Sequence, residues 1–541
     1  MSKPDHTQTR AHLIGGGIAS MAAAAILIRD GDLLGRNITI YEAQDRLGGS
    51  LDGSGDPEHG YMVRGGRMIE RKYLCTYDLF GSIPTLDGTQ TVTQEIFQWN
   101  ETMRTDSKAR LVRAGHKIDA PEFGLTERQI LTIEKLVLEP EAMLGDSRIC
   151  DHFDEAFFRT NFWMMWGTTF AFQPWHSAVE LKRYLIRFTH MVSGFNELRG
   201  IMRTVYNQYD SLVLPLRKWL QERGVDFCTN LTITDVVFAE RNGETRVEAI
   251  VGQTAGESVR MDVEPRDLVI ATLGSMTDAS AIGGMDAPAA LNGKAEGAAW
   301  TLWEKIAAGR PELGRPERFS GHVDESKWLS FTTTLKTPAF FDHVRDFTGN
   351  VPGEGGLVTF TDSNWLMSIV LPHQPHFIGQ PDDVQVFWGY GLNVDAPGNF
   401  VKKPMAACTG RELMTELLGH LGVPDQAGAM LEGAICLPCM MPFITSQFLR
   451  RKKGDRPPVH PSGYANFAVT GQFCELPDDV VFTVEYSVRS AMTAVYELLG
   501  LDRKPPEVFK GQLEPGNLVK AFRALHDMDD AGVRIARELA R

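Results

Sequence analysis

Four residues near the amino terminus have the types and the spacing needed to bind a dinucleotide. Gly15 and Gly17 would let the backbone approach a pyrophosphate closely, and Ser20, in place of the motif's third glycine, is small enough for a helix to pack on a strand. Glu42 follows Gly17 by about 25 positions, where an acidic side chain commonly binds ribose hydroxyls. The pattern predicts a dinucleotide-binding site.

The residues that follow Glu42 indicate which dinucleotide binds. Arg46, Gly48 and Gly49 form an Arg-x-Gly-Gly run, which is similar to the extension of this motif in many FAD-binding proteins. The sequence therefore favours FAD over NAD as the cofactor.

These residues need a βαβ unit to position them. The apolar run before Gly15 predicts a buried strand, 18–29 predicts the crossover helix, and 37–41 predicts the second strand. The N-terminus of the helix would offer unpaired N–H groups and a positive dipole end to the pyrophosphate.

Two distant segments agree with an FAD domain assembled from separate parts of the chain. Each of 267–274 and 464–471 is an apolar strand that runs into a glycine, and a long helix over about 480–499 follows the second. Flavoproteins commonly have Gly-Asp where this chain has Gly471 and Gln472. The candidate FAD contacts here are Ser275 and Thr277, which directly follow the first segment, and Gly471, which ends the second.

The expected fold class is α/β: a Rossmann-type FAD-binding domain assembled from discontinuous segments, with a mixed α/β substrate domain and a helical C-terminal region. With 541 residues, 43% of them apolar and 23% charged, the chain can form two or three domains. The predicted division is an FAD-binding domain at 1–110, 206–290 and 441–504, a largely helical substrate-lining segment at 111–205, the substrate domain at 291–440 and a C-terminal helical tail at 505–541.

Composition excludes several classes of partner and site. A net charge of -14 and a pI near 5.5 argue against nucleic acid binding, which needs a basic face. Seven scattered cysteines do not form a disulfide framework, so the expected location is cytoplasmic. Cys436 and Cys439 form a CxxC without a second ligand pair or a helix N-terminal setting, so we expect a structural role and no metal site.

Two segments are candidates for membrane contact. The stretch 11–28 is apolar enough to suggest a signal peptide, but its glycines and the strand after it are better explained by the nucleotide unit. Apolar residues at helical spacing in 518–525, beside Lys520 and Arg523, predict a short amphipathic helix that either packs on its own protein or makes peripheral membrane contact. Because the first strand begins close to Met1, with no long arm before it, a monomer is preferred over a homodimer.

Many strings of residues between 11 and 500 match those of one family. The strings are 15–20, 64–67, 161–163, 170–172, 175–177, 206–209, 274–278, 374–377, 386–391 and 442–448. They resemble the oleate hydratase family, once described as myosin-cross-reactive antigens. The resemblance implies an FAD-containing hydro-lyase that adds water to the cis-9 double bond of free unsaturated fatty acids, converting oleate to 10-hydroxystearate without net redox change. The flavin would then act as an electrostatic and structural element of the site.

The resemblance also implies which residue supplies the proton. An isolated alkene is a poor base, so it needs a well-placed acid, and the developing carbocation must be met by water at its other carbon. In the family a tyrosine donates the proton, and the best match is Tyr184, in a stretch that looks helical. The alternative for Tyr184 is a buried structural tyrosine.

The water-activating residue departs from the family pattern, which is Arg-Gly-Gly-Arg-Glu. Here the run 64–68 ends in Met68, whose thioether cannot take a proton from water. Either Glu70 replaces the family's glutamate, or Arg67, backbone carbonyls and the flavin polarise water without a carboxylate. Glu70 would otherwise be an ordinary surface or salt-bridged glutamate. The candidate FAD contacts in this run are Gly65 and Gly66.

The acyl chain needs apolar, adaptable walls, and 162–172 is rich in aromatic residues and methionine. Met165 and Phe172 from this cluster are candidate substrate contacts. For the carboxylate, the family uses the histidine of Gln-Pro-His-Phe with polar residues before it. Here His376 is present, the residues before it are mostly apolar, and His373 is a candidate second cationic or hydrogen-bonding group. The alternative is a shifted head-group site with a different chain-length or regiochemical preference.

Two other functions stay open at this point. A redox flavoenzyme of the amine oxidase or fatty acid desaturase or isomerase type would use the same cofactor site, and a binding protein would merely retain FAD. Incubation with oleate and FAD without oxygen separates the hydratase from both, because only the hydratase yields a product heavier by one water.

Overall fold

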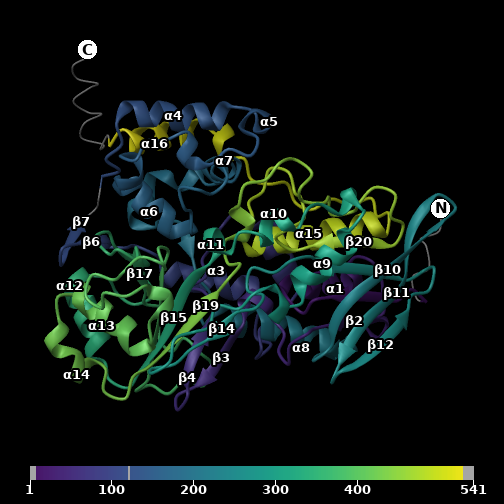
Figure 1. Cartoon of the computed structure of the whole chain (residues 1–541), viewed down its shortest axis with the longest axis horizontal. Coiled ribbons are helices and arrows are strands. Elements are labelled where there is room, and N and C mark those ends of the chain that lie inside the picture. Colours follow the sequence, from purple (N-terminus) through teal and green to yellow (C-terminus); the bar gives the residue numbers. More distant parts are fainter. Residues whose placement is uncertain (1–7, 120–121, 528–541) are drawn as a thin grey trace.

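The dinucleotide motif lies on a five-stranded parallel sheet. The computed structural model describes residues 8–119 and 122–527, and the strand order of this sheet is β20-β13-β1-β2-β9 (Figure 1). The strands are β1 (Ala11–Ile14), β2 (Ile38–Tyr41), β9 (Asp226–Cys228), β13 (Leu268–Thr272) and β20 (Phe467–Thr470). These positions confirm an α/β fold whose dinucleotide domain is assembled from discontinuous segments.

Helix α1 (Ile18–Arg29) is the predicted crossover helix. Residues 18–27 are all buried, because the helix lies between the sheet and helix α15 (Val484–Leu498). The run Ala22–Ala25 in its centre combines high helix propensity with side chains small enough for close packing on both sides. This packing holds the preceding glycine turn at the carboxyl edge of the sheet.

A second sheet has eight strands in the order β14-β19-β15-β18-β17-β16-β6-β7. Every neighbouring pair is antiparallel except β16 with β6. The strands are β6 (Ala109–Arg113), β7 (His116–Asp119), β14 (Ala281–Ile282), β15 (Trp328–Leu335), β16 (Leu357–Phe360), β17 (Met367–Val370), β18 (Gln385–Gly391) and β19 (Ile435–Met441). The sheet therefore includes strands from outside 291–440, the segment predicted for the substrate domain.

A hairpin of β3 (Gly53–Asp56) and β4 (Gly60–Val63) connects the two sheets. The N–H of Val63 donates to Thr332 Oγ1 at 3.1 Å, and the N–H of Tyr61 donates to Thr334 Oγ1 at 2.8 Å, so β4 is fixed across the buried strand β15. The chain leaves β4 directly into residues 64–68. This connection places the Arg-Gly-Gly-Arg-Met run between the dinucleotide sheet and the eight-stranded sheet.

A helical lobe lies at the upper left of Figure 1. Its helices are α4 (Glu127–Leu138), α5 (Glu141–Leu144), α6 (Asn161–Phe170), α7 (Ala178–Arg187) and α16 (Pro515–Leu525). Two ion pairs anchor helix α7: Arg451 Nε lies 2.7 Å from Glu180 Oε1 in a buried pair, and Arg183 Nε lies 2.7 Å from Glu141 Oε1, whose side chain is partly exposed. These pairs tie α7 to α5 and to the segment that contains Arg451.

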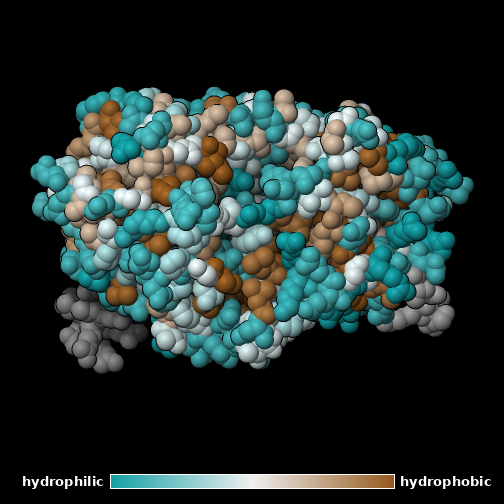
Figure 2. Space-filling view, turned by 90° about the horizontal axis from the view of Figure 1, so that it is seen from below, coloured by the Kyte–Doolittle hydropathy of each residue, from teal (hydrophilic) through white to brown (hydrophobic). Residues whose placement is uncertain are grey.

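The structure also contains helices and strands outside the two larger sheets, the β3–β4 hairpin and the helical lobe. The helices are α2 (Leu74–Phe80), α3 (Val92–Thr102), α8 (Leu214–Glu222), α9 (Ala299–Ala307), α10 (Glu317–Ser320), α11 (Val323–Ser326), α12 (Ala339–Thr348), α13 (Gly410–His420) and α14 (Ala427–Met430), and the strands are β5 (Ile69–Glu70), β8 (Ile201–Met202), β10 (Thr232–Arg241), β11 (Glu244–Thr254) and β12 (Glu257–Asp262). Figure 2 shows one face with hydrophilic residues around small apolar groups. Across residues 8–119 and 122–527, no helix combines the length and apolar character that crossing a membrane requires.

The CxxC pair lies in the core of the eight-stranded sheet. Cys436 and Cys439 are on β19, fully buried, and at a spacing that directs their side chains to opposite faces of the strand. Burial raises the pKa of Cys436 to about 12 and that of Cys439 to about 11, so neither forms a reactive thiolate near neutral pH. The two cysteines therefore pack the sheet, as the sequence predicts.

Candidate functional site

A cavity of about 2080 Å³ opens at the carboxyl ends of β1, β2, β13 and β20. We call it the dinucleotide cavity. It collects eight of the predicted cofactor contacts from four segments of the chain: Gly15, Gly17, Glu42, Arg46, Gly49, Ser275, Thr277 and Gly471. This is the edge at which open parallel sheets bind their ligands.

The glycine turn fits a pyrophosphate group. Gly15 has a φ of +95°, which favours glycine, and a Cβ at Gly16 would lie only 2.7 Å from Leu47 Cδ2. Gly17 precedes α1 without a side-chain cap, so the first N–H groups of the helix stay available at the cavity wall. These donors and the helix dipole favour a negatively charged ligand here.

Glu42 lies where the ribose of a dinucleotide is expected. Its carboxylate accepts hydrogen bonds from the N–H of Gly16 at 2.6 Å and from the N–H of Gln44 at 2.9 Å, and burial raises its pKa. The same side chain lines the dinucleotide cavity. Glu42 therefore supports the glycine turn and also faces the dinucleotide cavity.

Four predicted cofactor residues lie outside this cavity wall. Ser20 is buried, with its hydroxyl 3.2 Å from Thr272 Oγ1, which is the close helix-on-strand packing expected of a small residue. Gly48 has a φ of +117° and donates its N–H to the carbonyl of Gly16 at 2.9 Å. Gly65 and Gly66 line the two cavities described next.

Gln472 stands where flavoproteins commonly have aspartate. It lines the dinucleotide cavity and also forms hydrogen bonds with a strained turn at 482–483. Its amide oxygen accepts the N–H of Phe482, and its Nε2 donates to the carbonyl of Thr483 at 2.9 Å and to Ser487 Oγ at 2.8 Å. Phe482 has a φ of +70°, which is unfavourable for a bulky side chain, and its ring centre lies 5.5 Å from the guanidinium of Arg67. An aspartate has no N–H to donate, so it could not make the hydrogen bond of Gln472 to the Thr483 carbonyl.

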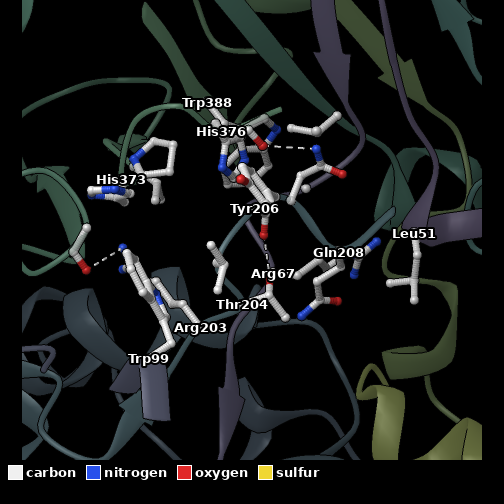
Figure 3. A pocket seen from close by; sticks show the side chains of 18 of the residues that line it. Leu51, Arg67, Trp99, Arg203, Thr204, Tyr206, Gln208, His373, His376 and Trp388 are labelled. Atoms are coloured by element: carbon white, nitrogen blue, oxygen red, sulfur yellow. Dashed lines mark hydrogen bonds between the residues drawn. The ribbon is translucent and has the colours of Figure 1, made fainter. Parts of the chain in front are cut away.

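A second cavity of about 720 Å³, the middle cavity, adjoins the first (Figure 3). It shares Ser50 and Asp52 with the dinucleotide cavity. Four buried side-chain N–H groups on its wall have no hydrogen-bond partner within the described residues: Arg67 Nε, Arg203 Nη2, Gln208 Nε2 and Trp388 Nε1. Unpaired buried donors are costly, so this wall favours a ligand that is rich in acceptor atoms.

The two predicted head-group histidines line the middle cavity (Figure 3). Burial, followed by the charge of Arg203, lowers the pKa of His376 to about 3, and burial also lowers the pKa of His373. His376 is therefore neutral near pH 7, and His373 is more weakly basic than an exposed histidine. Both histidines can still form hydrogen bonds. For His373, which was predicted as a second cationic or hydrogen-bonding group, the lowered pKa favours the hydrogen-bonding role.

A third cavity of about 830 Å³, the tyrosine cavity, brings the four predicted catalytic residues together. Tyr184, Arg67, Met68 and Glu70 all line it, and it shares Gly65 and Gly66 with the middle cavity. Most of the other lining residues are apolar or aromatic: Ile69, Tyr73, Phe170, Ala171, Phe188, Ile201, Trp328, Leu357, Val370, Trp388, Tyr390 and Phe482. The site is thus a largely apolar space with a few polar groups.

Tyr184 is held rigidly on α7. It is buried, its hydroxyl donates to the carbonyl of Val481 at 2.6 Å, and the rings of Phe170 and Phe172 meet it edge-on at 5.0 Å. Burial raises its pKa well above the ordinary value. Tyr184 therefore stays protonated, which is the form that a proton donor needs.

Glu70 is buried and salt-bridged. Arg187 Nη1 donates to Glu70 Oε1 at 2.9 Å, the N–H of Lys72 donates to Oε2 at 2.6 Å, and His190 Nε2 lies 3.5 Å away. Met68 is half-buried on the same cavity wall. The geometry matches the salt-bridged alternative for Glu70 more closely than a free general base.

We expect Glu70→Gln to lower the free energy of unfolding by about 3 kcal/mol, because it removes a buried counter-ion of Arg187. Arg187 keeps Asp479, whose carboxylate lies 3.5 Å from its Nε. Turnover per folded molecule should change by less than about threefold. Denaturant unfolding and turnover at matched folded fractions measure the two effects. A loss of about 100-fold in turnover would instead show that Glu70 takes the proton from water.

The predicted tunnel contacts Met165 and Phe172 are not among the lining residues. Met165 is buried in the core, and Phe172 packs against Tyr184 and, at 4.5 Å, against Phe448, so it supports the tyrosine from behind. The cluster reaches the cavity instead through the end of α6, at Thr168, Thr169 and Phe170. The composition of 162–172 indicated the cluster but not which helical turn faces the cavity.

Sequence reasoning missed several residues that line these cavities, among them Arg203, Gln208 and Tyr73. Gln208 lies inside the string 206–209, which the sequence singled out without giving it a role. Arg203 and Tyr73 carry no pattern that would distinguish them from other arginines and tyrosines.

The chain is similar to known proteins over most of its length. The chain matches the model of the MCRA family over residues 8–496. It is 38% identical over 532 residues to the oleate hydratase of Streptococcus pyogenes serotype M49 (strain NZ131), covering 96% of this chain and 90% of that protein. It is 33% identical over 568 residues to the linoleate hydratase of Lactiplantibacillus plantarum, covering 96% and 99%. The solved structure of cyclohexylamine oxidase from Brevibacterium oxydans IH-35A has the same fold, with a TM-score of 0.51 at 14% identity over 92% of this chain and 100% of that one.

Proposed function

The chain belongs to the MCRA family, and from that premise we propose that it is an FAD-containing hydro-lyase acting on free unsaturated fatty acids. The reaction is addition of water to the cis-9 double bond, oleate to 10-hydroxystearate, without net redox change. The observation that carries the proposal is the series of three adjoining cavities, which leads from the glycine turn to Tyr184. The dinucleotide cavity would hold FAD, which supplies an electrostatic and structural element of the site when bound.

The proposed chemistry follows from the tyrosine cavity. Tyr184 gives its phenol proton to one alkene carbon, so the π electrons form the new C–H bond, and water adds to the other carbon through a lone pair that forms the C–O bond. The added water then loses a proton, which returns to the Tyr184 phenolate, so the net change is the addition of one water. The Tyr184 hydroxyl must turn from the carbonyl of Val481 to give its proton to the alkene. A carbocation is a strong electrophile, so the water needs to be positioned more than it needs a strong base. This explains how a site with Met68 in place of glutamate can still hydrate.

Incubation of the purified protein with oleate and FAD, without oxygen, tests this proposal. The expected product is heavier than oleate by one water. Consumption of an electron acceptor would support a redox flavoenzyme, and an unchanged fatty acid would support a binding protein.

We predict that Glu42→Ala weakens FAD binding by about ten- to 100-fold. The substitution removes the carboxylate at the expected ribose position and the acceptor of the Gly16 N–H, so it acts on the ligand and on the turn. Titration of the apoprotein with FAD measures the change, and NAD is the matched control ligand, which should not stabilise the protein. Equal stabilisation by NAD and FAD in a melting experiment would contradict the assignment of FAD.

Peripheral membrane contact through the helical lobe is a further part of the proposal. Large apolar side chains are exposed along this lobe: Leu131, Leu138, Met143, Leu513, Leu518, Val519 and Phe522. Lys520 and Arg523 lie among them on α16, which is the pattern of a helix that lies in a membrane interface. Long-chain fatty acids partition into membranes, so this surface would lie close to the source of the substrate.

Replacement of both Leu518 and Phe522 by aspartate should lower binding to vesicles of mixed phosphatidylglycerol and phosphatidylcholine by about tenfold or more. Co-sedimentation measures the bound fraction, and Ile282→Asp, at an exposed apolar residue on β14, is the control. Unchanged binding of the double variant would mean that α16 only packs on its own protein.

The chain is predicted to be a monomer in preference to a homodimer. Sedimentation velocity on the same samples checks this prediction.

A further inference from the structure

Arg203 places a cation without a counter-ion on the wall of the middle cavity. The only hydrogen bond of its side chain within the described residues runs from Nη1 to the carbonyl of Gly353, at 3.4 Å, while Nη2 is buried without a partner. Burial lowers the pKa of Arg203 to about 10, and no acidic group contributes to the shift. The guanidinium therefore stays charged near pH 7 in a poorly solvated place.

The other ionisable groups of this cavity do not neutralise Arg203. Asp52 is the only acidic residue that lines it in the described part of the chain, and that carboxylate is engaged by Arg64 at 3.5 Å and Arg46 at 3.7 Å. His376 is neutral near pH 7, and Arg67 adds a second positive charge. Arg203 is half-buried, with its Nη2 fully enclosed. A cation in such a place without a counter-ion is costly, so the cavity favours an anionic ligand.

The position of Arg203 distinguishes this ligand from the cofactor. Arg203, His373 and Trp99 line the middle cavity alone, whereas Ser50 and Asp52 also line the dinucleotide cavity. Figure 3 shows Arg203, His373 and Trp99 together on one side and Leu51 on the other, with Arg67 labelled between them. Arg203 is therefore at the end of the middle cavity that lies away from the cofactor.

We propose that Arg203 binds the carboxylate of the fatty acid, and that the acyl chain runs from it past Gly66 and Trp388 into the tyrosine cavity. This inference rests on the proposed function. Val370 and Pro372, in the segment before Gln-Pro-His-Phe, are apolar and line the middle cavity, so they suit the methylene chain and not the head group. His373 and His376 flank the carboxylate as hydrogen-bonding groups.

Arg203 then determines the preference for a free acid. Oleyl alcohol has the same chain and double bond but no negative charge, so it cannot use the guanidinium as a counter-ion. The preference for oleate over oleyl alcohol should therefore depend on Arg203, whereas the chemistry at Tyr184 should not.

The test compares Arg203→Met, Arg203→Lys and the control Arg199→Met as FAD-loaded proteins. Arg199 is exposed on the same segment and pairs with Glu197 at 2.8 Å. We expect Arg203→Met to weaken oleate binding, measured by titration calorimetry, by about 100-fold and to change oleyl alcohol binding by less than about threefold. Arg203→Lys should recover at least about tenfold of the loss, and Arg199→Met should behave as wild type.

Thermal melting separates this role from a structural one. Methionine removes an uncompensated buried charge, so Arg203→Met should melt at or above the wild-type temperature, whereas loss of a structural arginine would lower it. Retention of the wild-type preference for oleate by Arg203→Met would overturn the inference. If oleate binding depends on Arg203 but no variant and no wild-type sample adds water, the proposed function fails while the carboxylate site stands.

Discussion

Tyr184→Phe is expected to lower turnover by about 100-fold or more, because it removes the hydroxyl proposed to protonate the alkene. FAD and fatty acid binding should be retained, since the ring keeps its contacts with Phe170 and Phe172. The lost hydrogen bond to the carbonyl of Val481 should cost only about 1 kcal/mol of stability. Product formation by mass spectrometry, beside FAD absorbance and oleate titration, measures all three.

Tyr486→Phe is the matched control for Tyr184→Phe. Tyr486 is also buried and donates its hydroxyl to a backbone carbonyl, that of Cys474 at 2.8 Å, but it does not line the tyrosine cavity. It should keep near wild-type turnover with a similar loss of stability. Wild-type turnover in Tyr184→Phe would show that another residue donates the proton.

Met68→Glu is expected to raise turnover by about tenfold or more, because it puts a carboxylate on the wall of the tyrosine cavity where water can lose its proton. The gain should be present when this carboxylate is ionised and should be lost as the pH falls through its pKa. Met68→Gln has the same size but cannot act as a base, so it should show no gain at any pH. Turnover of the two variants measured against pH distinguishes them. Equal turnover of both variants would mean that this site positions water without any need for a carboxylate.

The parts of the fold that were predicted depend on residues close together in the chain. The strand, glycine turn and helix over 11–29 are determined within a short βαβ unit, so the helix bounds 18–29 were predicted correctly.

The parts that were missed depend on distant partners. Glu70 is held by Arg187, which is 117 positions away, so its ion pair has no local signal. The role of Arg203 depends on the lack of a counter-ion beside it in the fold. The sequence contains 69 acidic residues and does not show which side chains lie near any of them. Met165 was chosen from a correct cluster, but the face that α6 presents depends on where the helix ends, at Phe170.

The amide of Gln472 has a thermodynamic consequence, because one side chain borders the dinucleotide cavity and also braces Phe482 on the wall of the tyrosine cavity. If a ligand in one cavity holds this amide in a single orientation, it also holds Phe482 on the wall of the other cavity. Linkage then requires reciprocity: by whatever factor FAD increases the affinity for a fatty acid, the fatty acid increases the affinity for FAD by the same factor. Substrate availability would thus regulate how much of the enzyme carries its cofactor.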